Sequence, residues 1–179
     1  MIPVNIIKKY CPEGSNAFRI LVEHSFAVAD KALYIAGLHP EMALDRAFIY
    51  EAAMLHDIGI VKTDAPEIYC FGSFPYICHG YLGSEILAAE GFSRHAFVCE
   101  RHTGTGISLE EIESKNLPLP HREMRPVSLE EQLICFADKF YSKTNLEKEK
   151  KPDKIRNGLQ KYGEGAVEQF DAWLKLFLG

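Results

Sequence analysis

The sequence predicts an all-α protein. Apolar residues recur mostly three and four positions apart, which is the spacing that lines one face of a helix. No segment alternates between apolar and polar residues for long enough to predict a strand. Of the 179 residues, 47% are hydrophobic and 25% are charged, which is typical of a globular domain with a sizeable core.

The first two predicted helices lie in the N-terminal third of the chain. The apolar spacing predicts a helix over residues 17–37, with Gly37 ending it in a left-handed conformation. A second helix is predicted over residues 40–59, where Pro40 suits a helix start and Gly59 an end.

The rest of the chain is predicted to hold shorter helices joined by loops. Prolines and a glycine break up residues 61–78, so this segment is predicted to be a loop with short helical turns. Two capping boxes, Ser108 with Glu111 and Ser128 with Glu131, predict where two later helices begin. The predicted helices are residues 81–91, 93–104 (capped by Ser93 and ended by Gly104), 108–116, 128–144, and two near 152–162 and 165–178, with a proline-rich loop at 117–126.

Composition narrows the class of protein further. A net charge of −5 disfavours a nucleic-acid partner bound through its phosphates, although a local basic pocket stays open as an alternative. The five cysteines are odd in number and contain no C-x-x-C pair, so we expect reduced thiols rather than disulfides or a cysteine zinc site. No run approaches the roughly 18 apolar residues of a membrane span, and no signal peptide is expected because the first residues show no charged n-region and no small-residue cleavage site. We therefore expect a cytoplasmic protein that does not bind membranes.

His56 and Asp57 follow an apolar run in "AAMLHDIG". Helix neighbours point about 100° apart, so both can aim at one point only if it lies beyond the helix end. A metal ion accepts imidazole and carboxylate together, and it removes the cost of burying an unpaired aspartate. The doublet therefore predicts a metal site.

Four more residues are candidate partners for this doublet. His24 and Asp138 each lie within an apolar run, while His79 begins a predicted helix and His102 ends one. Each has a structural alternative when taken alone. A buried histidine is more often hydrogen-bonded, Asp138 could cap its helix or pair with Lys139 or Lys143, and His102 could be a favourable cation at a helix C-terminus. The joint pattern favours ligation.

The ordered motifs "LVEHSFAVA", "AAMLHDIG", "HGYLGSEIL", "ERHTGTG" and "LICFADK" resemble the HD-domain superfamily of metal-dependent phosphohydrolases, in particular its HDIG-type members. The resemblance covers residues 18–145 and implies an HD-domain helical bundle. We therefore expect residues 1–179 to form a single HD domain, with a motif-bearing core at about 18–145 and C-terminal helices at about 152–178.

The resemblance also implies a binuclear metal centre. His24, His56, Asp57 and Asp138 match the family's shared single-metal site, while His79 and His102 match the two further histidines of members with a second metal. Asp57 would bridge the two ions. The donors admit divalent iron, manganese, nickel, cobalt or zinc.

The motifs also narrow the activity within this superfamily. Thr103 follows His102 and no Gly-Tyr-Pro signature is present, which argues against a cyclic-dinucleotide phosphodiesterase. The bacterial symmetrical dinucleoside-tetraphosphate hydrolases are similar in length and ligand order, but the motifs do not assign that substrate.

Candidate substrate groups are basic residues near the motifs. Lys62 follows Asp57 by five positions and could reach back over the metals, and the loop at 117–126 could present His121, Arg122 or Arg125 to a phosphate. Each could equally be a solvated loop residue. The charge run at 145–154 is interpreted as a solvated linker. Helically spaced apolar residues near the C-terminus are expected to form core or a homodimer face, namely Phe170, Trp173, Leu174 and Phe177.

The leading hypothesis is a metal-dependent phosphohydrolase that hydrolyses a nucleotide or another small phosphate ester through metal-activated water. Asp57 would hold the metals, and Lys62 with an arginine would offset charge on the phosphate. One alternative is a di-iron HD-type oxygenase acting on a small phosphonate or polyol. Another is a non-catalytic HD module that senses a nucleotide, which the complete ligand set disfavours.

Overall fold

The computed structural model describes residues 2–146 and 148–179 and confirms the all-α class. The helices are α1 (Pro3–Tyr10), α2 (Asn16–Leu38), α3 (Arg46–Leu55), α4 (His79–Ala89), α5 (Ser93–Arg101), α6 (Leu109–Ser114), α7 (Leu129–Asp138), α8 (Pro152–Leu159) and α9 (Glu164–Leu178). Short 3-10 turns add Pro40–Met42, Ile58–Lys62, Pro66–Ile68, Tyr76–Cys78 and Gln160–Tyr162, and the two strands are β1 (Asp64–Ala65) and β2 (Cys70–Phe71).

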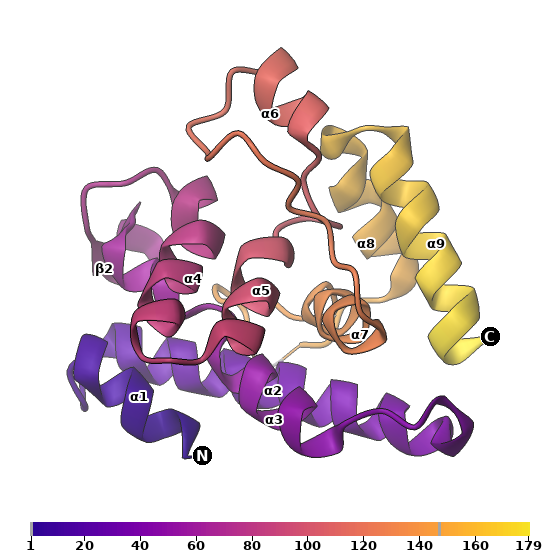
Figure 1. The fold of residues 1–179 in the computed structure, drawn as a ribbon, viewed down its shortest axis with the longest axis horizontal. Helices are drawn as coiled ribbons and strands as arrows, with labels where there is room; N and C mark the ends of the chain where they lie inside the picture. The colour runs from indigo at the N-terminus through magenta and orange to yellow at the C-terminus, as the bar shows by residue number, and fades with distance from the viewer. Residues whose placement is uncertain (1, 147) are drawn as a thin grey trace.

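The helices pack around α7 (Figure 1). Helices α2 and α3 run side by side along one edge, α4 and α5 form a pair next to them, and α8 and α9 lie beyond α7. Helix α6 lies between two loop segments, on the side of the molecule away from α2 and α3 (Figure 1). This arrangement brings segments more than 100 residues apart in the sequence to one central region.

The main hydrophobic core lies between α2, α3, α7 and α9. Phe136 of α7 contacts two aromatic rings of α9, with ring centroids 5.4 Å from Phe170 and 5.5 Å from Phe177. Trp173 is 2% exposed, and its indole Nε1 donates a hydrogen bond of 2.9 Å to Gln132 Oε1. The apolar face of the last helix therefore belongs to the core of the chain.

The two N-terminal helix predictions need correction. Helix α2 runs past Gly37, which keeps an ordinary negative φ, and ends at Leu38, because Pro40 disfavours helical geometry at His39 before it. The predicted helix over 40–59 is broken after a 3-10 turn by Ala43, whose φ is 49°.

Further differences concern where helices begin. The sequence analysis did not predict α1. Helix α3 starts at Arg46 because the Asp45 carboxylate accepts a hydrogen bond from the Phe48 backbone N–H. The Ser108–Glu111 capping box is confirmed, whereas Ser128 caps α7 without a reciprocal bond from Glu131.

The segment at 61–78 contains short helical turns, as predicted, together with the small antiparallel pair β1–β2. In this pair Asp64 faces Phe71 and Ala65 faces Cys70. All five cysteines are buried free thiols, as expected. Within the described residues, no helix is both long and apolar enough to span a bilayer.

Gly59 is a packing requirement rather than a helix end. It lies in the 3-10 turn Ile58–Lys62, where a Cβ atom would overlap the carbonyl oxygen of His79 and lie 2.9 Å from the Cα of Gly83. These are backbone atoms of α4, so they cannot move aside without shifting the helix. The close approach of turn and helix therefore depends on glycine at this position.

We expect Gly59→Ala to destabilise the fold by about 3 kcal/mol, or roughly 10 °C in melting temperature, because α4 must move away. Thermal unfolding followed by circular dichroism measures this. The matched control is Gly158→Ala in α8, where a Cβ meets no atom within 4 Å and should stabilise the helix by about 0.5–1 kcal/mol. Equal melting temperatures for the two variants would contradict this packing role.

Candidate metal centre

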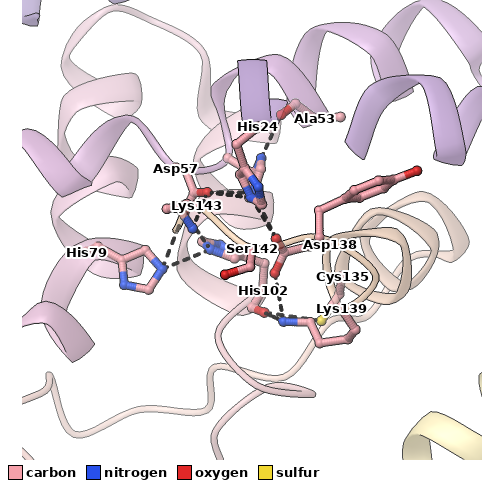
Figure 2. Close-up of polar contacts among 12 residues, drawn as sticks. His24, Ala53, Asp57, His79, His102, Cys135, Asp138, Lys139, Ser142 and Lys143 are labelled. Atoms are coloured by element: carbon pink, nitrogen blue, oxygen red, sulfur yellow. Dashed lines mark hydrogen bonds and ion pairs between the residues drawn. The ribbon is translucent and has the colours of Figure 1, made fainter. Parts of the chain in front are cut away.

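The six side chains predicted as ligands meet within the bundle, and Figure 2 shows His24, Asp57, His79, His102 and Asp138 there. His24 lies in the middle of α2, and the others lie at or beside the ends of four other helices. Those residues are His56 and Asp57 after α3, His79 at the start of α4, His102 after α5, and Asp138 at the end of α7.

The end of α3 explains how neighbouring residues face one point. The helix stops at Leu55, His56 caps it, and Asp57 leaves helical geometry with φ −105° and ψ 6°. The following turn then carries the chain toward α4. His56 and Asp57 are fully buried, and their Nε2 and Oδ2 atoms lie 2.9 Å apart. The predicted convergence beyond a helix end is confirmed.

Three of the histidines are oriented by the same backbone contact. In each, Nδ1 lies within hydrogen-bond distance of the carbonyl oxygen three residues earlier, which makes Nδ1 the donor and turns Nε2 toward the centre. The contacts join His56 to Ala53 at 2.6 Å, His79 to Tyr76 at 2.7 Å, and His102 to Cys99 at 2.6 Å. This ring orientation is the one that a metal ligand needs.

The first ligand group contains His24, His56, Asp57 and Asp138, with one donor atom of each lying within 4.8 Å of all the others. His24 Nε2 lies 2.9 Å from Asp138 Oδ1 and 3.1 Å from Asp57 Oδ2. Two imidazoles and two carboxylates at this spacing form a donor set suited to a divalent transition metal.

The second group contains Asp57, His79 and His102. Asp57 Oδ1 lies 3.5 Å from His79 Nε2 and 3.3 Å from His102 Nε2, and the two nitrogens are 3.0 Å apart. Burial, together with the nearby His102, lowers the pKa of His79 to about 3, and burial lowers that of His102 as well. Two neutral imidazoles therefore direct lone pairs at each other, an arrangement that a cation between them would relieve.

Unsatisfied atoms show that the residues present fit a metal. His56 Nε2 and both carboxylate oxygens of Asp57 are buried, and among the described residues they make no hydrogen bond of normal geometry. They lie within ion-pair distance of neighbouring groups. Because buried polar atoms that lack hydrogen bonds are costly, these atoms are suited to metal coordination.

Two lysines neutralise the carboxylates of the centre (Figure 2). Lys143 Nζ lies 2.6 Å from Asp57 Oδ2, and Lys139 Nζ lies 2.8 Å from Asp138 Oδ2. Burial opposes charge on both carboxylates, but the adjacent cations, with His56 first for Asp57 and Lys139 first for Asp138, hold their pKa values well below the usual range. Burial likewise opposes the charged form of His56, but the two carboxylates raise its pKa to about 9.

A cavity of about 360 Å³ opens onto this centre. His24 and Asp138 form part of its wall, together with Tyr76 and four lysines, which are Lys139, Lys143, Lys150 and Lys161. From sequence, Lys143 was predicted only as an alternative partner of Asp138, and Lys150 was predicted to lie in a solvated linker. A run of lysines with helical or loop spacing gives no sign of which ones turn inward, so the sequence carried little signal for this wall.

The substrate groups predicted from sequence lie elsewhere. Lys62 ends a 3-10 turn and is not among the described residues that line this cavity. His121 is exposed, Arg122 pairs with Glu100, and Arg125 pairs with Glu123. Their contact with substrate stays a prediction, and the lysines of the cavity wall are better placed for that role.

We expect His79→Ala and His102→Ala to bind one metal ion fewer than the parent protein, because each removes a ligand of the second group alone. Elemental mass spectrometry of purified protein measures the ions per chain. His95→Ala is the matched control, since His95 lies on α5, close to Glu51 of α3, and outside both ligand groups. Unchanged stoichiometry in His79→Ala and His102→Ala would remove these residues from the ligand set.

Fold and site together define an α-helical protein with a buried histidine–aspartate cluster suited to divalent metal ions. The HD-domain family profile matches residues 21–142, more than half of the chain. The chain belongs to the HD-domain family.

Relatives of the chain carry different names. An uncharacterized protein of Methanocaldococcus jannaschii is 33% identical over 138 residues, which cover 75% of this chain and 70% of that protein. A tRNA (cytidine(56)-2'-O)-methyltransferase of Picrophilus torridus is 31% identical over 154 residues, covering 79% of this chain and 40% of the relative. One of Thermoplasma volcanium is 29% identical over 123 residues, covering 68% and 32%. The chain thus spans less than half of either methyltransferase. No solved structure was found to match it.

Proposed function

We propose that this protein is a metal-dependent phosphohydrolase acting on a nucleotide or another small phosphate ester. The observation that carries the proposal is the pair of ligand groups sharing Asp57, placed at the inner end of a lysine-lined cavity. Divalent ions would supply Lewis acidity toward a phosphoryl oxygen and would acidify water at that position.

The residues of the chain have distinct roles in this proposal. Asp57 offers one carboxylate oxygen to each ligand group and would therefore be the ligand that both ions share. Lys139 and Lys143 lie beside the carboxylates at the inner end of the cavity, where their ammonium groups can bind nonbridging phosphate oxygens. Tyr76 stacks on His79, with ring centroids 4.6 Å apart, and so restricts access of water to that ligand.

The names of the relatives do not change this proposal. The matched segment makes up 40% of the Picrophilus torridus methyltransferase, so methyl transfer can belong to the rest of that protein. We propose hydrolysis because the ligand groups and the lysines lie within this chain. The cationic wall also favours a phosphate ester over a neutral polyol as substrate.

Metal content and phosphate release test the proposal together. The protein is produced without added metal, purified without chelator, analysed for metals, and assayed with p-nitrophenyl phosphate and with nucleoside mono-, di- and triphosphates. We expect about two ions per chain and release of phosphate that stops after dialysis against a chelator. Bound iron with oxygen uptake and no phosphate release would support the oxygenase instead. A nucleotide bound tightly and recovered unchanged would support the sensing module.

A further inference from the structure

A second cavity continues outward from the metal centre. It has a volume of about 290 Å³ and shares Lys139, Lys150 and Lys161 with the cavity that contains His24 and Asp138. Lys154 of α8 adds a fourth ammonium group to its wall. The shared lysines place the two cavities side by side, and together they form a path from the ligands to α8.

The outer cavity is cationic, and among the described residues Lys139 alone of its four lysines has an ion pair, to Asp138. Within the described residues, its lining contains four lysines and no aspartate or glutamate. Lys150 is half-buried and donates hydrogen bonds to two backbone carbonyls, at 2.7 Å to Tyr141 and 3.4 Å to Lys139. These contacts hold the ammonium group in the wall without neutralising it.

The ammonium groups of Lys154 and Lys161 are likewise uncompensated. Lys161 Nζ lies 4.8 Å from the ring centroid of Tyr162, and the structure gives neither Lys154 nor Lys161 an ion pair with a described carboxylate. Burial, followed by the charges of Lys139 and Lys143, lowers the pKa of Lys150 against the opposing effect of Asp138. Like charges so close together favour a bound polyanion.

The charges around the ligand groups also favour a polyanion. The carboxylates of Asp57 and Asp138 are matched one for one by the ammonium groups of Lys139 and Lys143. Two divalent ions would therefore add positive charge that these four groups leave uncompensated. The whole chain nevertheless carries a net charge of −5, so the positive potential is local to this path.

We propose that the outer cavity binds the distal phosphates of a substrate with a chain of two or more phosphates, whose reacting phosphate lies at the ligand groups. This inference rests on the proposed function and adds a substrate class to it. In the hydrolysis, the oxygen of water forms a bond to the reacting phosphorus and the bridging P–O bond breaks. The leaving phosphate keeps the electron pair, and the proton of water passes to solvent. The lysines of the outer cavity hold that leaving group.

Calorimetric titration of the metal-free protein tests the subsite without relying on activity. The probes are inorganic tripolyphosphate and orthophosphate, added to protein that has been dialysed against a chelator and then against buffer. We expect tripolyphosphate to bind at least about tenfold more tightly than orthophosphate, since it reaches both cavities. Equal affinities would overturn the proposal.

Substitutions locate the binding. Lys154→Gln and Lys161→Gln should each weaken tripolyphosphate binding by about fivefold and leave orthophosphate binding unchanged. Lys175→Gln in α9 makes the same change of charge outside both cavities and should alter neither affinity. Both side chains are exposed, so the variants are expected to fold. Unchanged tripolyphosphate affinity in both variants would overturn the proposal.

Two further results separate the alternatives. An oligonucleotide without terminal phosphates that binds as tightly as tripolyphosphate would mean that the path recognises a nucleic-acid backbone, which overturns the proposal. If tripolyphosphate binds as expected but no phosphate ester is hydrolysed by the metal-loaded protein, the subsite stands and the proposed function fails. If phosphate esters are hydrolysed but tripolyphosphate has no advantage over orthophosphate, the proposed function stands and the subsite fails.

Discussion

Replacing Asp57 with alanine is expected to remove both metal ions and to lower the rate of phosphate release by at least about a thousandfold. Asp57 is the residue shared by the two ligand groups, with Oδ2 beside His24 and His56 and Oδ1 beside His79 and His102. Without Asp57, the second group keeps only its two histidines, and the first group keeps a single carboxylate, that of Asp138. Metal content and phosphate release, measured on the same preparation, check the result.

The same substitution also leaves the ammonium group of Lys143 buried without its carboxylate. Breaking one partner of such a pair costs about 3–5 kcal/mol, so loss of activity could reflect unfolding. The double variant Asp57→Ala with Lys143→Met removes both charges and should recover most of that stability without recovering metal. Asp30→Ala, an exposed change on the same helix as His24, should alter neither property. Two ions per chain in a folded Asp57→Ala protein would refute the shared-ligand role.

Lys143→Met is expected to destabilise the metal-free protein by about 3 kcal/mol and the metal-loaded protein by less than about 1 kcal/mol. Without metal, Lys143 Nζ lies 2.6 Å from Asp57 Oδ2 and is a principal counter-charge for that buried carboxylate. With metal bound, the ions neutralise Asp57, and the ammonium group then repels them. Urea unfolding of the two forms measures the difference.

Thermodynamic linkage converts this difference into metal affinity. A gap of about 2 kcal/mol between the two forms corresponds to metal binding about 30-fold tighter in Lys143→Met than in the parent. Lys31→Met is a suitable control, because Lys31 pairs with Glu149 at the surface and has no contact with the ligands. Equal destabilisation of both forms, with unchanged metal affinity, would show that Lys143 does not compete with metal.

The ligands were accessible from sequence because their chemistry restricts where they can occur. An aspartate within an apolar run, such as Asp138, needs a cation beside it. Asp57, which follows His56 at the end of another apolar run, needs one as well. Helix ends were predicted less well. The left-handed residue Ala43 and the cap Asp45 divide a segment whose apolar spacing alone predicts one continuous helix.

The substrate-binding residues, in contrast to the ligands, were difficult to predict from sequence. Lys62 was chosen because it follows Asp57 by five positions and Arg122 because it lies on a proline-rich loop, yet Arg122 pairs with Glu100 and Lys62 lies outside the cavity wall. Lys150 was assigned to a solvated linker, but it turns back to donate to the carbonyl of Tyr141. A charged residue tolerates many surroundings, so its sequence neighbours do not reveal the direction of its side chain.

The sequence by itself predicted the helical class from its apolar periodicity and the six candidate ligands from polar residues in apolar runs and at helix ends, and its motifs carried the resemblance to the HD-domain family. Only the tertiary structure decided which cations face the centre and that two lysine-lined cavities join there. Those features depend on how the segment after α7 folds back over the ligands. That path is set by contacts between residues far apart in the chain, which local sequence patterns do not encode.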